Sequence, residues 1–179
     1  MAIGKSKNQA FGYVKSKISN KLQGWKQKLL SSGGKGVLIK VVIMAIPNYT
    51  MSCFKLPKSL CKDISSRIAK YWWENGEKEN KVYWPTWKKL IEVKGKGGIG
   101  IRDLEALNTA LLAKQIWRFI RAPNLLVSRV IKAKYVRDHW MNKKPPNSAS
   151  WTWTSIHSAR HLLFNGLWKR IGDGDTEEI

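Results

Sequence analysis

Apolar residues near the start of the chain recur at steps of three and four, which is the period of one face of an α-helix. They form a single stripe made of Phe11, Val14, Ile18, Leu22, Trp25 and Leu29. The lysines of the same segment fall mostly off this stripe, so the pattern predicts an amphipathic helix. The segment 31–36 (SSGGKG) should end that helix, because glycine readily adopts the positive φ of a helix C-cap.

The next segments also read as helices. The run 37–46 is apolar all round and fits a buried strand or a buried helix equally well until Pro47, which ends or kinks it. Residues 58–73 have the helical period again, and 85–91 is a short helix with Pro85 suited to its first turn. The apolar side of the 58–73 helix is made of Leu60, Ile64, Ile68, Tyr71 and Trp72.

The second half of the chain begins after a glycine-rich connector at 94–100, which is the best internal boundary. Asp103 then caps a helix over 104–121, and Glu105 stabilises its first turn. Two further helices follow at 125–135 and 151–164, separated by a loop that contains two prolines. These elements predict a mainly α protein.

The charge of the chain is strongly positive and unevenly distributed. The formal net charge is +21, and residues 1–62 contain twelve lysines, no arginine and no acidic residue. A sustained field of one sign predicts a polyanionic partner, above all nucleic acid. Two other interpretations remain open: a solvated lysine-rich face, or a basic helix that binds an acidic protein or a membrane surface.

Most candidate catalytic and cofactor motifs fail on context. Gly95, Gly97 and Gly100 match G-x-G-x-x-G, but no strand precedes them and no acidic residue follows at the required distance. Polymerisation needs carboxylates that hold two metal ions, and the chain has no Asp-Asp pair. We therefore predict no bound cofactor and no polymerase or nuclease activity for the chain alone. The acidic residues at the end of the chain, which we interpret as a turn, are Asp173, Asp175, Glu177 and Glu178.

The cysteines and histidines do not predict a metal site. Cys53 and Cys61 lie in apolar helical patterns, at a spacing that suits neither a zinc site nor a disulfide framework. His157 and His161 are four residues apart on a predicted helix, but a third ligand is absent nearby in sequence except for His139. We expect no structural zinc. The tryptophans beside basic residues are expected to be core, with at most one ring stacking on a base: Trp72, Trp73, Trp84 and Trp87.

Several long motifs resemble one protein family. They are GWKQKLLSSGGKGVLIKVVIMAIPNYTMSCFKLP at 24–57, GGIGIRDLEALNTALLAKQIWR at 97–118, and shorter ones such as VYWPTWKKL at 82–90 and RVIKAKY at 129–135. They are similar to plant LINE-type (non-LTR) retrotransposon reverse transcriptases, in the region between the palm and the zinc-binding and ribonuclease H segments. Isolated retroelement-derived reading frames of plant nuclear and mitochondrial genomes resemble the chain in the same way.

The resemblance implies a domain organisation and a role. Residues 1–92 correspond to a helical thumb-like bundle and residues 93–179 to a second, small helical connector, and the family's catalytic palm is absent. The thumb of that family grips the template–primer through its backbone. The implied partners are RNA, RNA–DNA hybrid or single-stranded DNA, together with the palm and ribonuclease H domains in a full polyprotein. The residues expected to bind nucleic acid are Lys15, Lys17, Lys21, Lys26, Lys28 and Lys35.

The sequence leaves the history and the location of the chain open. A decayed retroelement remnant with no function is a further alternative to a working thumb. The apolar run 37–46 is interrupted by Lys40 and is too short to cross a bilayer, so no transmembrane segment is predicted. We expect a nuclear or cytoplasmic protein. A mitochondrial location is an alternative, because the start is basic and free of acidic residues as a transit segment would be, but it carries lysine in place of the arginine typical of such segments.

Overall fold

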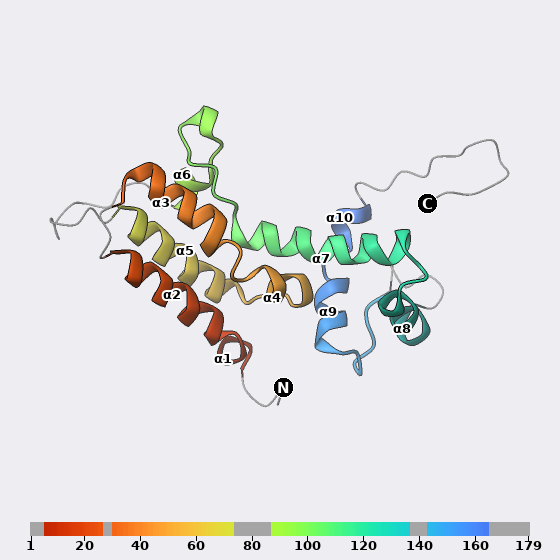
Figure 1. Cartoon of the computed structure of the whole chain (residues 1–179). Coiled ribbons are helices and arrows are strands. Elements are labelled where there is room, and N and C mark those ends of the chain that lie inside the picture. Colours follow the sequence, from red (N-terminus) through yellow and green to blue (C-terminus); the bar gives the residue numbers. More distant parts are fainter. Residues whose placement is uncertain (1–5, 27–29, 74–86, 137–142, 165–179) are drawn as a thin grey trace. The chain divides into compact units, whose positions relative to one another are not determined.

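The computed structural model describes residues 6–26, 30–73, 87–136 and 143–164 (Figure 1). Within these ranges the regular structure is helical and no strand occurs, which confirms the mainly α prediction. None of the described helices combines the length and the apolar character needed to span a membrane.

The chain divides into two compact units. Unit 1 comprises Met1–Tyr49 and Leu56–Leu107, and unit 2 comprises Thr50–Lys55 and Asn108–Ile179. The second boundary between the units therefore falls between Leu107 and Asn108, inside a helix, and not at the glycine-rich connector 94–100. The predicted division into a thumb-like region, 1–92, and a connector, 93–179, concerns the roles of these regions and stays a prediction.

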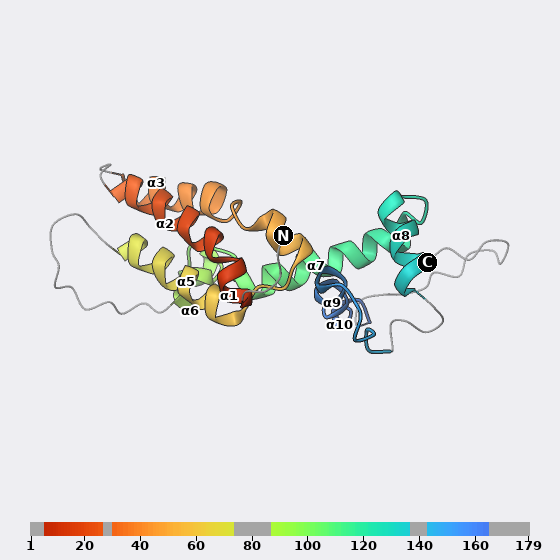
Figure 2. The same ribbon diagram turned by 90° about the horizontal axis from the view of Figure 1, so that it is seen from below.

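Unit 1 is built on three neighbouring helical segments. Figures 1 and 2 show α2, α3 and α5 side by side, and α5 packs against both of the others. The helical elements of this unit are α1 (Lys7–Ala10), α2 (Gly12–Lys26), α3 (Ser32–Leu38), a π-helix (Ile39–Ile43), α5 (Lys58–Trp73), α6 (Trp87–Ile91) and a 3₁₀ turn (Lys94–Lys96).

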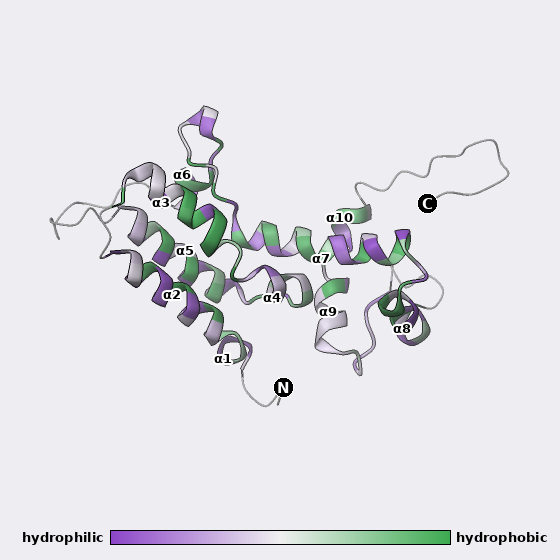
Figure 3. Cartoon of the chain, in the orientation of Figure 1, coloured by the Kyte–Doolittle hydropathy of each residue, from purple (hydrophilic) through white to green (hydrophobic). Residues whose placement is uncertain are grey.

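The core of unit 1 follows the predicted apolar stripes. In the first stripe, Val14, Ile18 and Leu22 of α2 are buried, as is Phe11 just before this helix, while Trp25 is half-buried and Leu29 lies outside the described residues. On α5 the predicted side is buried as well, except for Trp72, which is half-buried. The polar and apolar sides of these helices are visible in Figure 3. Burial of these side chains provides the main stabilisation of the unit.

The glycine-rich segment 31–36 does not end a helix as predicted; it begins one. Ser31 caps α3, since its Oγ accepts a hydrogen bond from Gly34 N at 3.2 Å. Gly33, Gly34 and Gly36 do not have positive φ; Gly36 instead lies so close to the Trp72 ring that an added Cβ would be 3.4 Å from Cζ3. This glycine therefore lies in contact with an indole of α5, and sequence alone does not show such a contact.

The connector between α6 and α7 is a closed turn held by backbone hydrogen bonds. Ile101 N donates to Leu90 O at 3.2 Å and Gly100 N donates to Glu92 O at 2.8 Å. Gly97 and Gly100 have φ of 83° and 72°, which favours glycine. A Cβ added to Gly98 would overlap the backbone carbonyl of Glu92. The turn is thus a structural link between two helices, with α6 and not a strand before it.

Replacement of Gly98 by Ala is expected to destabilise unit 1. The added methyl would overlap backbone atoms, so the turn must open, at a cost of roughly 2–4 kcal/mol. Thermal or urea unfolding followed by circular dichroism measures the change. Gly95→Ala is the matched control, because nothing lies within 4 Å of a Cβ at that position. Equal stability of the two variants would contradict the turn described above.

Unit 2 contains its own apolar core. Buried residues of α7 (Leu104–Arg121) pack against α9 (Trp151–His157), with α8 (Leu126–Tyr135) contributing partly buried side chains. The ring of Tyr135 on α8 stacks on that of Trp153 on α9 at 5.2 Å and 6°. The buried cluster consists of Leu112, Ala113, Ile116, Phe119, Trp153, Ile156 and Ala159.

A buried asparagine organises a second contact within unit 2. Asn108 on α7 is 3% exposed, and its Nδ2 donates to the carbonyl oxygens of Met51 at 2.7 Å and Phe54 at 2.9 Å. Both carbonyls belong to the end of α4 (Asn48–Cys53), a short helix that the apolar pattern did not predict. The Asn108 amide therefore satisfies carbonyls that a helix end leaves without an intrahelical partner.

The last predicted helix is divided in two. The run 151–164 forms α9 and α10 (His161–Phe164), joined by a turn at 158–160. Ser150 caps α9 by accepting a hydrogen bond from Trp153 N at 3.2 Å. The boundary predicted at Asp103 is confirmed: Asp103 caps α7, since its Oδ2 accepts a hydrogen bond from Ala106 N at 2.9 Å. The predicted 85–91 helix is described only as α6, from Trp87.

Candidate nucleic-acid interface

The lysine-bearing helix α2 lies against α5, and the two helices run in the same direction. The contacts that α5 makes with α2 and with the preceding α1 follow the same order along both segments. These contacts are Asn8 with Ser59 (Oδ1 to Oγ, 3.2 Å), Lys15 with Asp63 (Nζ to Oδ2, 2.7 Å) and Trp25 with Tyr71 (ring centroids, 6.2 Å). One side of α2 therefore packs against α5, and only lysines on the remaining sides are accessible to a ligand.

Lys15 is partly neutralised by the first acidic residue of the chain. Its Nζ lies 2.7 Å from Asp63 Oδ2, with side chains that are 34% and 55% exposed. The hydrogen bond and charge of Lys15 lower the pKa of the Asp63 carboxyl, and Arg67 lowers it further. An ion pair this exposed contributes little stability. Its main effect is on the surface potential, because one carboxylate lies among cations.

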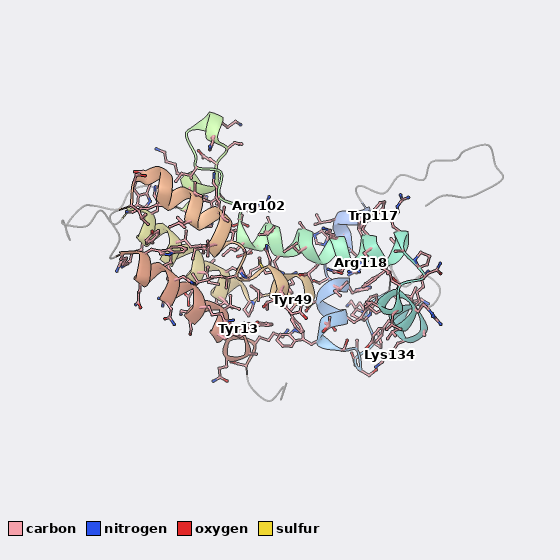
Figure 4. All side chains as sticks on the ribbon, viewed as in Figure 1. Tyr13, Tyr49, Arg102, Trp117, Arg118 and Lys134 are labelled. Atoms are coloured by element: carbon pink, nitrogen blue, oxygen red, sulfur yellow. The ribbon has the colours of Figure 1, made fainter. Side chains whose placement is uncertain are left out.

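Lys17 and Lys21 occupy the opposite flank of α2. They are four residues apart, so they share a face, and both are exposed. The Lys17 ammonium lies 5.9 Å from the ring centroid of Tyr13, which is 43% exposed and labelled in Figure 4. Lys26 is eleven residues after Lys15 and so returns to the flank that faces α5.

The outer face of α2, between these two flanks, is polar and uncharged. Ser16, Asn20 and Gln23 are all exposed there. A nucleic-acid backbone lying across this face would meet neutral hydrogen-bonding groups in the middle and lysines on either side. We call the set Lys15, Lys17, Lys21 and Lys26, with the neutral residues between them, the α2 face.

Lys35, another of the predicted lysines, is not part of this face. Lys35 is half-buried on α3, where its Nζ lies 5.6 Å from the ring centroid of Tyr71. This cation–π contact explains Lys35 as part of the packing of unit 1. Lys28 lies outside the described residues. The α2 face thus retains four of the six predicted residues, one of them in an ion pair.

Sequence reasoning missed the cations that α5 adds. Arg67 and Lys70 follow Asp63 by four and seven residues, so they share its flank of α5, next to α2; both are exposed. Lys58 and Lys62 on α5 are exposed too. The sequence did show that these four residues fall off the apolar stripe of their helix. It did not show that α5 lies next to α2, which is what brings the two sets of cations together.

Two of the tryptophans weighed as base-stacking candidates line a recess in unit 1. Trp72 and Trp73 contact each other edge to face at 6.5 Å and 87°, and they border this recess with Lys89. Trp73 is 37% exposed. Trp87 is half-buried, with Nε1 3.5 Å from Asp103 Oδ1, and Trp84 lies outside the described residues. Packing therefore accounts for Trp72 and Trp87, whereas Trp73 keeps an exposed ring.

The described carboxylates do not form a catalytic cluster. Asp63 pairs with Lys15, and Asp103 caps α7. Over the described ranges, no group of three His, Cys, Asp or Glu side chains could hold a metal ion. The predicted absence of zinc and of catalytic activity stays a prediction. The acidic residues at 173–178 lie outside the described residues.

The histidines and cysteines are explained by packing. His157 is buried against Trp153, with Nδ1 3.3 Å from Arg160 Nη1, whereas His161 is exposed. His139 lies outside the described residues. Cys61 is 3% exposed, and burial raises the pKa of its thiol to about 11, with Glu105 and Asp103 adding to the effect. Cys53 is half-buried, and burial raises its pKa as well.

Two plant proteins match the chain along much of its length. The first, an Arabidopsis thaliana sequence described as the uncharacterized mitochondrial protein AtMg00310, is 43% identical over 133 residues, which are 73% of this chain and 86% of the relative. This chain belongs to the same family. The description of this relative names no activity.

The second relative is much longer than this chain. It is described as the putative ribonuclease H protein At1g65750 of Arabidopsis thaliana and is 31% identical over 170 residues. The match covers 92% of this chain but only 27% of the relative, so the chain corresponds to about a quarter of that protein. The two matches together agree with a retrotransposon-derived fragment. Family models and solved structures give no match.

Proposed function

We propose that this chain binds nucleic acid through the phosphate backbone, using the α2 face together with Arg67 and Lys70 of α5, as the thumb-like part of a retrotransposon reverse transcriptase. The observation that carries the proposal is the arrangement of cations on both flanks of one neutral, exposed helix face. Lysine recognises phosphate as a point charge and does not read base sequence. RNA, RNA–DNA hybrid and single-stranded DNA are therefore all ligands, with little sequence preference.

The proposed role is binding and not catalysis. The described carboxylates Asp63 and Asp103 are engaged in an ion pair and a helix cap, and the Asp-Asp pair of the polymerase palm is absent from the sequence. The ribonuclease H description of the longer relative belongs to a protein of which this chain matches 27%. In the full polyprotein, palm and ribonuclease H domains would supply the chemistry. The mitochondrial description of the other relative supports a mitochondrial location.

Fluorescence anisotropy with labelled RNA, hybrid and single-stranded DNA of several sequences tests the proposal. Binding should be similar for all of them and should weaken steeply with salt, because each lysine–phosphate contact releases counterions. About four to six engaged cations give a slope of log affinity against log salt of roughly −3 to −5. Competition with anionic vesicles separates this role from membrane binding. Salt-independent binding, or complete displacement by vesicles alone, would overturn the proposal.

Removing the Asp63 carboxylate should increase the affinity for nucleic acid, which provides a second test. Asp63→Asn removes the one negative charge beside Lys15 and releases its ammonium for a phosphate. We expect binding to tighten by up to about tenfold at 0.1 M salt and the salt slope to steepen by roughly one. Glu92→Gln, also exposed and in unit 1, is the charge-matched control. If both variants tighten binding equally, net charge and not the α2 face is responsible.

A further inference from the structure

Helix α7 presents a stripe of cations around an exposed tryptophan in unit 2. Lys114, Trp117, Arg118 and Arg121 follow one another at steps of three, one and three, which places all four on one side of the helix. All four are exposed, and Figure 4 labels Trp117 and Arg118 on this helix. The other side of α7 supplies the core of unit 2 through Leu112, Ile116 and Phe119. We call these four residues the α7 stripe.

Trp117 is not needed for the core that its helix forms. Its side chain is 40% exposed, whereas Trp153 of the same unit is 2% exposed and stacks on Tyr135. Arg121 lies above the Trp117 ring, with Cζ 5.7 Å from the centroid. The guanidinium helps to hold the ring in place, and the exposed part of the indole remains open to a planar partner.

The described residues around the stripe in unit 2 carry positive charge and no negative charge. Between residues 106 and 137 the sequence has seven basic residues and no acidic one. The described residues of unit 2 contain no aspartate or glutamate at all. Unlike Lys15, the cations of the α7 stripe therefore have no neighbouring carboxylate within the described part of their own unit. Such a field attracts a polyanion.

We infer that the α7 stripe is a second nucleic-acid site, specific for single strands. One unpaired base stacks on Trp117, and Lys114, Arg118 and Arg121 contact the adjoining phosphates. An exposed ring among cations is the arrangement by which proteins hold single strands without reading sequence. A duplex cannot use the ring, because its bases are already stacked. The site goes beyond the proposed function, since it lies in unit 2 and requires an unpaired base.

Substitutions at Trp117 in the full 179-residue chain test the ring. Trp117→Leu keeps an apolar side chain but removes the π face, and it should weaken binding of a 12-mer of deoxythymidine by roughly 5- to 100-fold. Trp117→Phe should retain part of the affinity. An abasic 12-mer and a blunt duplex should bind all three proteins equally, because neither offers an unpaired base. Equal loss on the abasic strand would show that the substitution acts through the fold and would overturn the inference.

The charges of the α7 stripe and the proximity of a bound base to Trp117 can be tested independently of Trp117 substitution. Arg118→Gln with Arg121→Gln should reduce the salt slope for single strands by about 1.4, whereas the matched pair Lys143→Gln with Lys144→Gln, exposed in the loop of the same unit, should change it less. Photocrosslinking of a strand containing 5-iodouracil should label Trp117. Labelling of other tryptophans only, or equal slopes for the two pairs, would refute the α7 site.

The two sites can be tested separately. When the lysines of the α2 face are replaced by glutamine, Trp117→Leu should still weaken binding of the deoxythymidine 12-mer by the same factor as it does in the parent chain. That factor measures the stacked base alone, so it survives a failure of the proposed function at the α2 face. Disappearance of the factor in the lysine-depleted background would mean that Trp117 acts only through the α2 face, and the α7 stripe would not be a site of its own.

Discussion

A variant that carries Lys15→Gln, Lys17→Gln, Lys21→Gln and Lys26→Gln should bind every nucleic acid roughly a hundredfold more weakly than the parent at 0.1 M salt. The salt slope should become shallower by about three, because Lys15 is already partly paired with Asp63 and contributes least. Single-stranded and hybrid ligands should lose similar factors, since the lysines contact phosphates. Fluorescence anisotropy across a salt series measures both quantities.

The matched control replaces four exposed lysines elsewhere in unit 1, at Lys88, Lys89, Lys94 and Lys96. This control removes the same charge from α6 and the following turn. Both proteins should remain helical, because none of the eight lysines is buried. If the control loses as much affinity as the α2 variant, the effect is one of net charge, and the α2 face is not the site.

Asn108→Asp should destabilise unit 2 by about 3 kcal/mol or more. The Asn108 amide donates to the carbonyl oxygens of Met51 and Phe54, and the residue is 3% exposed. A carboxylate in this place would have no hydrogen to donate and would face two oxygens at short range. Asn108→Ala should cost less, because it leaves the carbonyls without a partner but adds no buried charge.

Urea unfolding followed by tryptophan fluorescence measures these changes, and Asn20→Asp on the exposed side of α2 is the control for the change of charge. The Asn20 variant should unfold at nearly the same urea concentration as the parent. An Asn108→Asp protein with parental stability would mean that the contact between α7 and the end of α4 does not stabilise unit 2.

The helices themselves could be predicted from local pattern. The stripe containing Val14, Ile18 and Leu22 has the period of one helix face, and these residues are buried as the pattern requires. Asp103 was predicted as a cap from its position before an apolar helix, and it accepts the expected backbone hydrogen bond. Such features depend on residues within a few positions of one another, so the sequence specifies them directly.

Features that depend on distant residues could not be predicted in this way. Gly36 lies in a helix and contacts the Trp72 ring, and Gly98 is required because the Glu92 carbonyl lies where a Cβ would be. The end of α4 depends on Asn108, more than fifty residues later. In each case the contact is set by tertiary packing or by the path of the turn, and local propensity carries no information about it.

The same distinction applies to the candidate sites. The sequence by itself determined a mainly helical protein with a lysine-rich, acid-free beginning, because composition and period are local properties. Only the tertiary structure decided which cations act together: Lys15 is paired with Asp63, Lys35 lies over Tyr71, and α5 adds its own cations beside α2. Exposure of Trp117 was likewise decided by packing, since helical spacing shows which residues share a face but not which face another helix covers.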